Sequence, residues 1–321
     1  MTDQRPPSDI SSLHQVIQQV KSVYLSDQPF VELLVIALLS RTHVLLEGVP
    51  GVAKTTLASF FATTCGCTIK RVQFTPDLLP SDIVGGSVFN MKTQEFKIRK
   101  GPIFTHILLG DELNRAPAKT QSALLEAMQE NQVTLEGEPF ELPQPFFTIA
   151  TQNPIEQVGV YALPEAQLDR FAFKLNIDYP SPHHELQMLT TYQQQKPTLT
   201  PLLNPNLILK YQLEVDQQFV HNDLKEYIVQ FAQATRQHEH IQRGMSPRAS
   251  LTWMKLAKAY SFLQGRTYVI PDDLFFLAPY VIAHRLKVYP DLAFEGIDTR
   301  MIVNQLLKKV IYQGQAQSYS P

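Results

Sequence analysis

The sequence predicts an α/β domain built on a parallel sheet, followed by a domain made only of helices. In the first part of the chain, apolar runs of strand length alternate with amphipathic helical runs, which indicates a sheet covered on both faces. One of these apolar runs leads through a glycine-rich segment into a helix. After Tyr179-Pro180-Ser181-Pro182 the alternation stops and helical patterns follow. We therefore expect domains at 1–180 and 181–312, and a disordered tail at 313–321.

The glycine-rich segment lies between the apolar run Val44-Leu45-Leu46 and a helical run from Leu57 to Ala62. Strand, glycine loop and helix in this order are typical of P-loop NTPases, in which backbone N–H groups and a helix N-terminus face phosphate oxygens. We expect nucleotide contacts from Gly48, Val49, Pro50, Gly51, Val52, Ala53, Lys54, Thr55 and Thr56. Lys54 is expected to reach the β- and γ-phosphates of ATP, and the Thr55 hydroxyl to bind Mg²⁺.

Ala53 departs from the usual motif, which has glycine before the lysine. A methyl group is tolerated there if the residue is helical, because only a positive φ demands glycine. The sequence is thus compatible with the motif provided that Ala53 takes helical angles. A glycine turn with a chance lysine is the alternative.

A second motif, Phe104 to Glu112, is an apolar run that ends in two carboxylates, as a Walker B strand does. Ligands of parallel sheets gather at the carboxyl ends of the strands. There Asp111 can hold Mg²⁺ through water, and Glu112 can orient and polarise the attacking water. A solvated loop is the alternative for an Asp-Glu pair, and the upstream glycine loop argues against it.

Length and composition allow two domains with cores of their own. The 321 residues are 44% hydrophobic and 18% charged, and 28 Lys+Arg against 30 Asp+Glu leave a net charge of −2, which does not favour nucleic acid as a partner. The polar stretch from Met1 to Ile10 is no signal peptide. The longest apolar run, Leu33 to Leu39, falls short of the ~20 residues that span a bilayer. We expect a cytoplasmic protein without a membrane segment.

Cysteine and histidine give no metal site. The chain has two cysteines, Cys65 and Cys67, which we expect to be reduced and partly buried. The pairs His183-His184 and His238/His240 match no metal-ligand spacing that also has thiolate or carboxylate partners.

The remaining elements follow from periodicity and turn residues. Two hairpins are expected, at 84–99 and at 133–142, where Glu136-Gly137-Glu138-Pro139 separates the two strands. Further strands are expected at 68–74, 146–150 and 171–177, and helices at 12–24, 29–40, 118–130, 184–193, 207–213, 222–237, 247–263, 271–286 and 298–310.

Taken together, these motifs resemble the MoxR family of AAA+ ATPases, in the helix-2-insert branch, from about Val20 to Leu286. The most specific matches are Leu45 to Thr55, Gln73 to Asp82, Asp111 to Pro117, Gln121 to Glu130 and Leu163 to Phe171. Alanine before the P-loop lysine is itself usual in this family. The resemblance implies an αβα AAA+ core with an all-α lid, binding of ATP or ADP with Mg²⁺, ATP hydrolysis, and a homo-oligomeric ring, a hexamer, in the ATP-bound state.

The resemblance also implies roles for residues outside the two Walker motifs. Asn153 matches sensor 1, which contacts the γ-phosphate or the lytic water. Arg170 matches the arginine finger, which acts on nucleotide bound by the neighbouring subunit; a salt bridge with Asp169 or Glu165 is the alternative. Arg248 matches sensor 2, and Pro247 before it indicates the first turn of a helix, so an exposed helix-start residue is the alternative.

Two positions depart from the family pattern, and the two hairpins have more than one possible role. Ser26-Asp27-Gln28 stands where a Val-Gly-Gln segment helps to bound the adenine pocket, so the adenine contacts do not carry over. Gly110 stands where alanine is usual. The two hairpins match insertions that face the pore or a partner in ring assemblies, and bracing of the inter-subunit surface is the alternative.

The resemblance favours an ATP-driven, chaperone-like machine that remodels or matures partner proteins or inserts a metal or cofactor. Its implied partners are proteins with a von Willebrand factor A domain. One alternative is a Mg-chelatase-like motor subunit, and another is a nucleic-acid motor or loader, which the near-neutral charge disfavours. A nucleotide-gated scaffold without turnover would need neither Glu112 nor Arg170.

Overall fold

The computed structural model describes residues 9–49, 51–92, 94–153, 161, 163–192, 199–291 and 298–312. The chain divides into two compact units, Asp9–Gln212 and a second unit that starts at Leu213. The tail expected at 313–321 lies outside the described residues. Among the helices that the structure describes, none combines the length and the apolar character needed to cross a bilayer.

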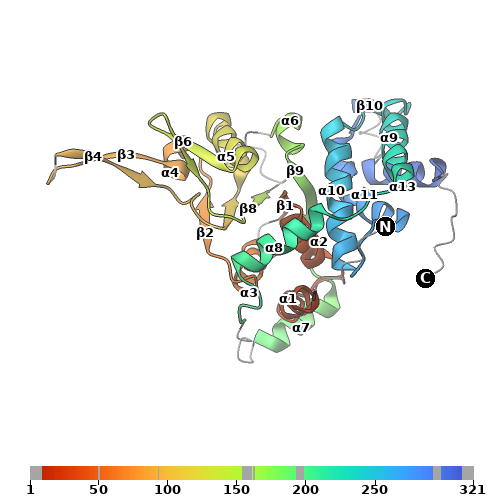
Figure 1. Cartoon of the computed structure of the whole chain (residues 1–321), viewed down its shortest axis with the longest axis horizontal. Coiled ribbons are helices and arrows are strands. Elements are labelled where there is room, and N and C mark those ends of the chain that lie inside the picture. Colours follow the sequence, from red (N-terminus) through yellow and green to blue (C-terminus); the bar gives the residue numbers. More distant parts are fainter. Residues whose placement is uncertain are drawn as a thin grey trace. The chain divides into compact units, whose positions relative to one another are not determined.

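A five-stranded parallel sheet forms the centre of the first unit, in the order β2-β5-β8-β1-β9 (Figure 1). Its strands are β1 (His43–Gly48), β2 (Ile69–Gln73), β5 (Ile107–Asp111), β8 (Phe147–Gln152) and β9 (Phe171–Ile177). The three inner strands β5, β8 and β1 are almost wholly buried, which explains the predominance of apolar residues in them. The predicted α/β fold with a parallel sheet is confirmed.

Helices cover both faces of this sheet. One face carries α1 (Ser11–Lys21), α2 (Phe30–Leu39) and α3 (Lys54–Thr64). The other face carries α4 (Pro80–Val84) and α5 (Ala118–Glu130). On the first face Phe61 of α3 meets Phe147 of β8, with ring centroids 6.0 Å apart. On the other, Leu124 of α5 shares a buried cluster with Leu45 of β1. Apolar residues on both faces of the inner strands thus hold the layers together.

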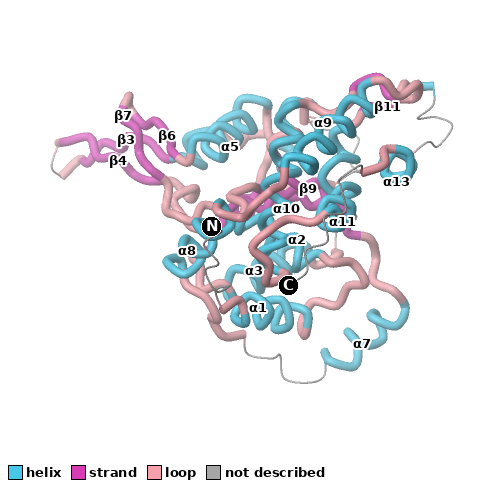
Figure 2. Tube along the Cα trace, turned by 45° about the vertical axis from the view of Figure 1, so that its right-hand side comes forward, coloured by secondary structure: helices cyan, strands magenta, loops and turns pink. Residues whose placement is uncertain are grey.

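Both predicted hairpins are present, and they lie side by side in the first unit (Figure 2). One pairs β3 (Gly85–Asn90) with β4 (Glu95–Lys100), and the other pairs β6 (Gln132–Leu135) with β7 (Glu138–Glu141). Between β6 and β7, Glu136 and Gly137 both have positive φ, as the tightest two-residue hairpin turns require.

The two compact units divide after Gln212, whereas the sequence places the domain boundary near 180. The first unit also includes α6 (Glu165–Leu168), β9 and α7 (Pro182–Tyr192), and the chain stays in this unit up to Gln212. There the Leu202 N–H donates to the Thr64 carbonyl at 2.8 Å, and Gln212 Nε2, in α8 (Pro205–Asp216), donates to the Leu38 carbonyl at 2.7 Å. The end of strand alternation does not reveal where the following helices pack, and this explains the difference.

The second unit is helical apart from one small sheet. Its helices are α9 (Asn222–Arg236), α10 (Pro247–Leu263), α11 (Pro271–Ile282) and α13 (Thr299–Lys309), with a 3₁₀ turn η2 (Ala283–Arg285). Trp253 anchors the core: its ring lies 5.2 Å from Phe231, and its indole N–H donates to the Leu274 carbonyl at 3.0 Å. The predicted helical domain is confirmed, with one small sheet that the sequence did not predict, in which β10 (Ile241–Arg243) pairs with β11 (Lys287–Val288). Strands this short are below the length at which alternation can be read.

Candidate active site

Polar side chains gather where β1, β5 and β8 end. These three strands are neighbours in the sheet and run parallel, so their carboxyl ends meet at one edge. The glycine loop follows β1 and leads into α3, Asp111 ends β5, and Asn153 follows β8. This edge is where ligands of open α/β sheets bind.

Two glycines of the loop have separate structural reasons. A side chain at Gly48 would bring a Cβ to within 2.3 Å of the Ile177 carbonyl oxygen on the neighbouring strand, so only glycine fits there. Gly51 has φ of +87° and open space around it, so its glycine serves the turn itself. Pro50, which the sequence includes in the loop, lies outside the described residues.

Ala53 does not take the helical angles on which the sequence interpretation depended. Its φ is 60° and its ψ 26°, in the left-handed region, and α3 begins one residue later. From there its carbonyl still accepts the Leu57 N–H at 3.0 Å, in the first turn of α3. The loop therefore enters the helix through a strained alanine, since a Cβ makes this region costly.

Lys54 lies at the centre of this edge. Its Nζ donates to the Gly48 carbonyl and, at 3.4 Å, to the Gln152 carbonyl, so it joins the ends of β1 and β8. Partial burial lowers the pKa of Lys54, and the nearby carboxylates of Asp111 and Glu112 act in the opposite direction. The ammonium group thus interacts with Asp111, which is expected to hold Mg²⁺, and with Glu112, which is expected to orient the attacking water.

Asp111 is nearly buried and bound on both of its oxygens. Oδ2 accepts the Thr55 hydroxyl at 3.4 Å, which brings the two expected Mg²⁺-binding residues together. Oδ1 accepts the Thr151 hydroxyl at 2.6 Å, and Arg71 Nη2 donates to Oδ2 at 2.6 Å. The sequence did not point to Thr151 or Arg71. Both lie on strands that flank β5, and only the pairing of those strands reveals them.

Glu112 is held by its backbone and by its side chain. Its φ is 57°, and its N–H donates to the Thr151 hydroxyl at 2.9 Å. Its Oε2 accepts Gln73 Nε2 at 2.6 Å and Arg115 Nη1 at 3.0 Å. Gln73, at the end of β2, begins one of the segments that match the family, but the sequence predicts no contact between it and Glu112. These contacts hold the carboxylate at the carboxyl end of β5, beside Asp111.

Asn153 is buried directly after β8, as expected for a residue at the end of a core strand. Its carbonyl accepts Asn114 Nδ2 at 3.2 Å. Asn114 lies in η1 (Leu113–Arg115), the 3₁₀ turn that follows Glu112. The segment after β8 is thereby attached to the segment after β5.

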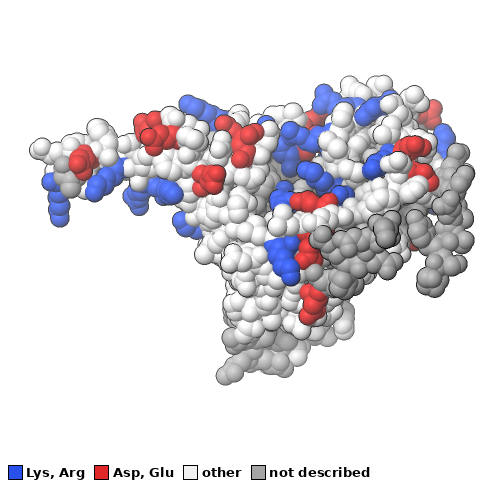
Figure 3. Space-filling view, viewed as in Figure 1, with Lys and Arg blue, Asp and Glu red and all other residues white. Residues whose placement is uncertain are grey.

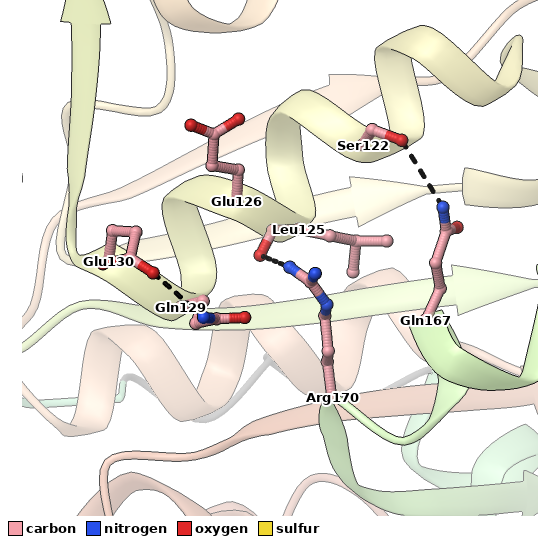
Figure 4. A pocket seen from close by; sticks show the side chains of 7 residues that line it. All are labelled: Ser122, Leu125, Glu126, Gln129, Glu130, Gln167 and Arg170. Carbon is pink, nitrogen blue, oxygen red and sulfur yellow. Dashed lines mark hydrogen bonds between the residues drawn. The ribbon is translucent and has the colours of Figure 1, made fainter.

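Arg170 lines a pocket of about 300 Å³ beside α5 (Figure 4). Its Nη1 donates to the Leu125 carbonyl at 2.7 Å, so the guanidinium is attached to its own subunit's helix. The other residues that line the pocket are Ser122, Leu125, Glu126, Gln129, Glu130 and Gln167. Arg170 is thus separate from the Lys54–Asp111–Glu112 group.

Arg248 lies in the second unit, in the first turn of α10 and exposed. The Ser246 side chain caps this helix by accepting the Ala249 N–H at 3.0 Å. Its place in the first turn agrees with the sequence expectation.

The two cysteines lie in the protein interior. Cys65 and Cys67 are free and buried, and burial raises the pKa of both thiols. Within the described ranges, no group of three or more His, Cys, Asp or Glu side chains is arranged to hold a metal ion.

Two family models match the chain. The ATPase family associated with various cellular activities (AAA) matches residues 43–173, and the AAA lid domain matches residues 233–306. The first match runs from β1 into β9. It includes all the predicted site residues except Arg248, which lies in the lid-domain match. The second covers most of the helices of the second unit.

Similar proteins align over nearly the whole chain. The uncharacterised protein YeaC of Bacillus subtilis is 47% identical over 300 residues, which are 93% of this chain and 94% of YeaC. Chaperone MoxR1 of Mycobacterium tuberculosis is 42% identical over 312 residues, 94% of this chain and 83% of MoxR1. The crystal structure of an inferred ATPase from Cytophaga hutchinsonii has a TM-score of 0.88 at 37% identity, covering 95% of this chain and 96% of its own. The chain therefore belongs to the MoxR family of AAA+ ATPases.

Proposed function

We propose that this ATPase couples the site at the ends of β1, β5 and β8 to chaperone-like remodelling or maturation of partner proteins. The observation that carries the proposal is the convergence of Lys54, Thr55, Asp111 and Glu112 at one edge of the sheet. A cation, a hydroxyl and two carboxylates in this arrangement match the needs of phosphoryl transfer, which depends on positioning and charge stabilisation. The chaperone name of MoxR1 supports the remodelling role.

The first step is binding of ATP or ADP. The loop from Gly48 to Thr56 would present backbone N–H groups and the N-terminus of α3 to the phosphates. Lys54 Nζ now donates to two backbone carbonyls, and it would exchange these for β- and γ-phosphate oxygens. The exchange replaces neutral acceptors by charged ones, which form stronger hydrogen bonds.

The residues that would hold Mg²⁺ fit its chemistry. Thr55 Oγ1 and Asp111 Oδ2 lie 3.4 Å apart, and both are hard oxygen donors of the kind that Mg²⁺ prefers. A bound Mg²⁺ would supply charge neutralisation for the β- and γ-phosphates. Asp111 would act through a water, since Mg²⁺ keeps several of its waters.

Hydrolysis then requires a positioned water. Glu112 would accept a hydrogen bond from that water and orient it, and its contacts with Gln73 and Arg115 limit how far the carboxylate can turn. Asn153, held next to β8, would contact the γ-phosphate or the same water. Arg170 and Arg248 are proposed to complete the site from a neighbouring subunit and from the lid, in a homo-oligomeric ring.

The β3–β4 hairpin is our candidate for contact with a partner protein. Its register places Phe89, Phe96 and Ile98 on one face, and the two phenyl rings lie 5.2 Å apart and are exposed. The opposite face carries Lys97 and Arg99, and Figure 3 shows basic residues along this hairpin. An apolar face of this kind suits an exposed apolar segment of another protein. Bracing between subunits stays the alternative.

A substrate trap tests the proposed function. Glu112→Gln should bind ATP without turning it over and should therefore keep its partners in place. We expect proteins with a von Willebrand factor A domain, or the client itself, to co-purify with this variant in ATP. The matched control is Lys54→Ala, which should bind no nucleotide and retain none of them.

Other outcomes of the same trap would contradict the proposal. Retention of DNA or RNA in place of protein would favour a nucleic-acid motor, and a magnesium-inserting enzyme would favour a Mg-chelatase-like subunit. Equal retention by both variants would show that capture does not depend on nucleotide. A cytoplasmic location stays a prediction that fractionation of the native cells can check.

A further inference from the structure

Arg71 donates hydrogen bonds to Asp111 Oδ2, the carboxylate oxygen that we assign to Mg²⁺. Its Nη2 and Nε donate to Asp111 Oδ2 at 2.6 and 3.1 Å, and Thr55 Oγ1 lies 3.4 Å from the same oxygen. The second oxygen, Oδ1, accepts the Thr151 hydroxyl at 2.6 Å. A carboxylate offers about four acceptor positions, so these contacts use most of its capacity.

Strand register explains how Arg71 reaches the site. β2 is an edge strand, and its parallel pairing places Gln73 opposite Asp111. Arg71 lies two residues earlier and hence on the same face, where its long side chain extends toward the strand end. Its Nη2 also donates to Gln73 Oε1 at 2.9 Å, and Gln73 in turn contacts Glu112. One pair of β2 side chains therefore touches both carboxylates.

Charge and exposure suggest what this contact does. A guanidinium is cationic at every physiological pH, so Arg71 places a positive charge next to Thr55 Oγ1 and Asp111 Oδ2. The Arg71 side chain is 54% exposed and that of Asp111 only 10%. Arg71 can therefore turn into solvent at small cost, provided that another cation takes its place beside the buried carboxylate.

We propose that Arg71 is a built-in competitor of Mg²⁺ at Asp111 and so sets the Mg²⁺ concentration that nucleotide binding requires. The inference rests on the proposed nucleotide site. Arg71 must leave Oδ2 before that oxygen can face a hydrated Mg²⁺. Until then the guanidinium keeps Asp111 neutralised and links it, through Gln73, to Glu112.

The test measures nucleotide binding in place of turnover. The affinity for a fluorescent N-methylanthraniloyl-ADP is determined over a range of Mg²⁺ concentrations and in EDTA. For Arg71→Gln we expect the half-saturating Mg²⁺ concentration to fall roughly three- to tenfold, with unchanged nucleotide affinity at saturating Mg²⁺. Arg71→Lys keeps a charge without the guanidinium fork, so it should shift in the same direction by less.

Lys70→Gln provides the matched control. It removes one positive charge from the same strand, one residue away, and alternation turns its side chain to the opposite face. Its Mg²⁺ dependence should match that of the unmodified protein. The melting temperature of each variant without nucleotide shows whether it is folded. If Arg71→Gln does not fold, the Mg²⁺ dependence of Arg71→Lys is the test of the proposal.

The possible failures can be told apart. Unchanged Mg²⁺ dependence in the Arg71 variants, with intact nucleotide binding, overturns the role of Arg71 and leaves the proposed function standing. Weaker binding of Arg71→Gln at saturating Mg²⁺ also overturns it, because Arg71 would then contribute to nucleotide binding directly and would not have given its place to the cation. If the unmodified protein binds no nucleotide with or without Mg²⁺, the proposed function itself fails.

Discussion

At the scale of single residues, Ala53 shows how the phosphate loop stores strain. Its φ of 60° is a conformation that glycine adopts freely and alanine does not. Ala53→Gly should therefore raise the free energy of unfolding by about 0.5–1 kcal/mol, after allowance for the greater freedom of glycine in the unfolded chain. Urea denaturation measures this change.

Ala58→Gly is the control for this change. Ala58 is buried inside α3, so glycine should lower the free energy of unfolding by about 1–2 kcal/mol, through its lower helix propensity and the loss of a buried methyl group. If Ala53→Gly lowered the free energy of unfolding as much as Ala58→Gly does, Ala53 would be helical in solution, as the sequence interpretation required.

The charges at the site should separate binding from turnover. Lys54→Ala should abolish nucleotide binding, because the loop loses its cation. Glu112→Gln should keep ATP binding and remove hydrolysis, since the amide cannot polarise the attacking water. Fluorescent-nucleotide binding and phosphate release measure the two effects. Hydrolysis by Glu112→Gln at the parental rate would disprove the assignment of Glu112.

At the scale of elements, a buried histidine joins two strands to a helix. His43 of β1 accepts the Thr148 N–H of β8 on Nδ1 at 3.0 Å, and its Nε2 contacts the Met128 carbonyl of α5 at 2.9 Å. These contacts need the neutral ring with its proton on Nε2. Burial lowers the pKa of His43 to about 4, against a hydrogen bond to Met128 that acts in the opposite direction.

The sign of the pH effect follows from this depressed pKa. Between pH 6.5 and about 4, His43 is protonated in the unfolded chain and neutral in the folded chain. Stability from this residue is complete above pH 6.5 and is lost as the pH falls through that window, by about 3 kcal/mol in all. His43→Gln should remove this share of the pH dependence. Identical slopes of unfolding free energy against pH in both proteins would contradict the prediction.

At the scale of the whole molecule, Arg170 should matter only in an assembly. Arg170→Ala should leave nucleotide affinity nearly intact and cut hydrolysis by roughly 10³–10⁵, the value of an arginine finger in GTPases. Its present contact, with the Leu125 carbonyl of its own subunit, would have to open for this role. Steady-state phosphate release and nucleotide titration measure the two quantities.

Mixing Arg170→Ala with Lys54→Ala makes the test sharper. Each variant has what the other lacks, so mixed rings should regain hydrolysis where an intact loop meets an intact finger. No recovery despite demonstrated exchange of subunits would count against catalysis across a subunit boundary. Turnover per subunit that stays constant on dilution to the monomer would do the same.

Local sequence signals were enough for the sheet and the two Walker motifs. The buried strands have apolar centres, such as Val44 to Leu46 and Ile107 to Leu109. The glycine loop lies between a strand and a helix, and the carboxylates Asp111 and Glu112 follow an apolar run. Each of these signals extends over about ten residues, because strand burial and loop geometry depend on near neighbours. Proximity of Thr55 to Asp111 then follows from parallel strands whose carboxyl ends meet.

Only the tertiary structure decided what depends on segments far apart in the chain. The register of β2 on β5 brings Arg71 and Gln73 to the carboxylates. The packing of residues 199–212 within the first unit places the division of the chain at Gln212. The left-handed Ala53 likewise reflects a loop that must join β1 to α3 at a set distance. Such features have no local signature, because packing between distant residues, and not the preference of any short segment, sets their geometry.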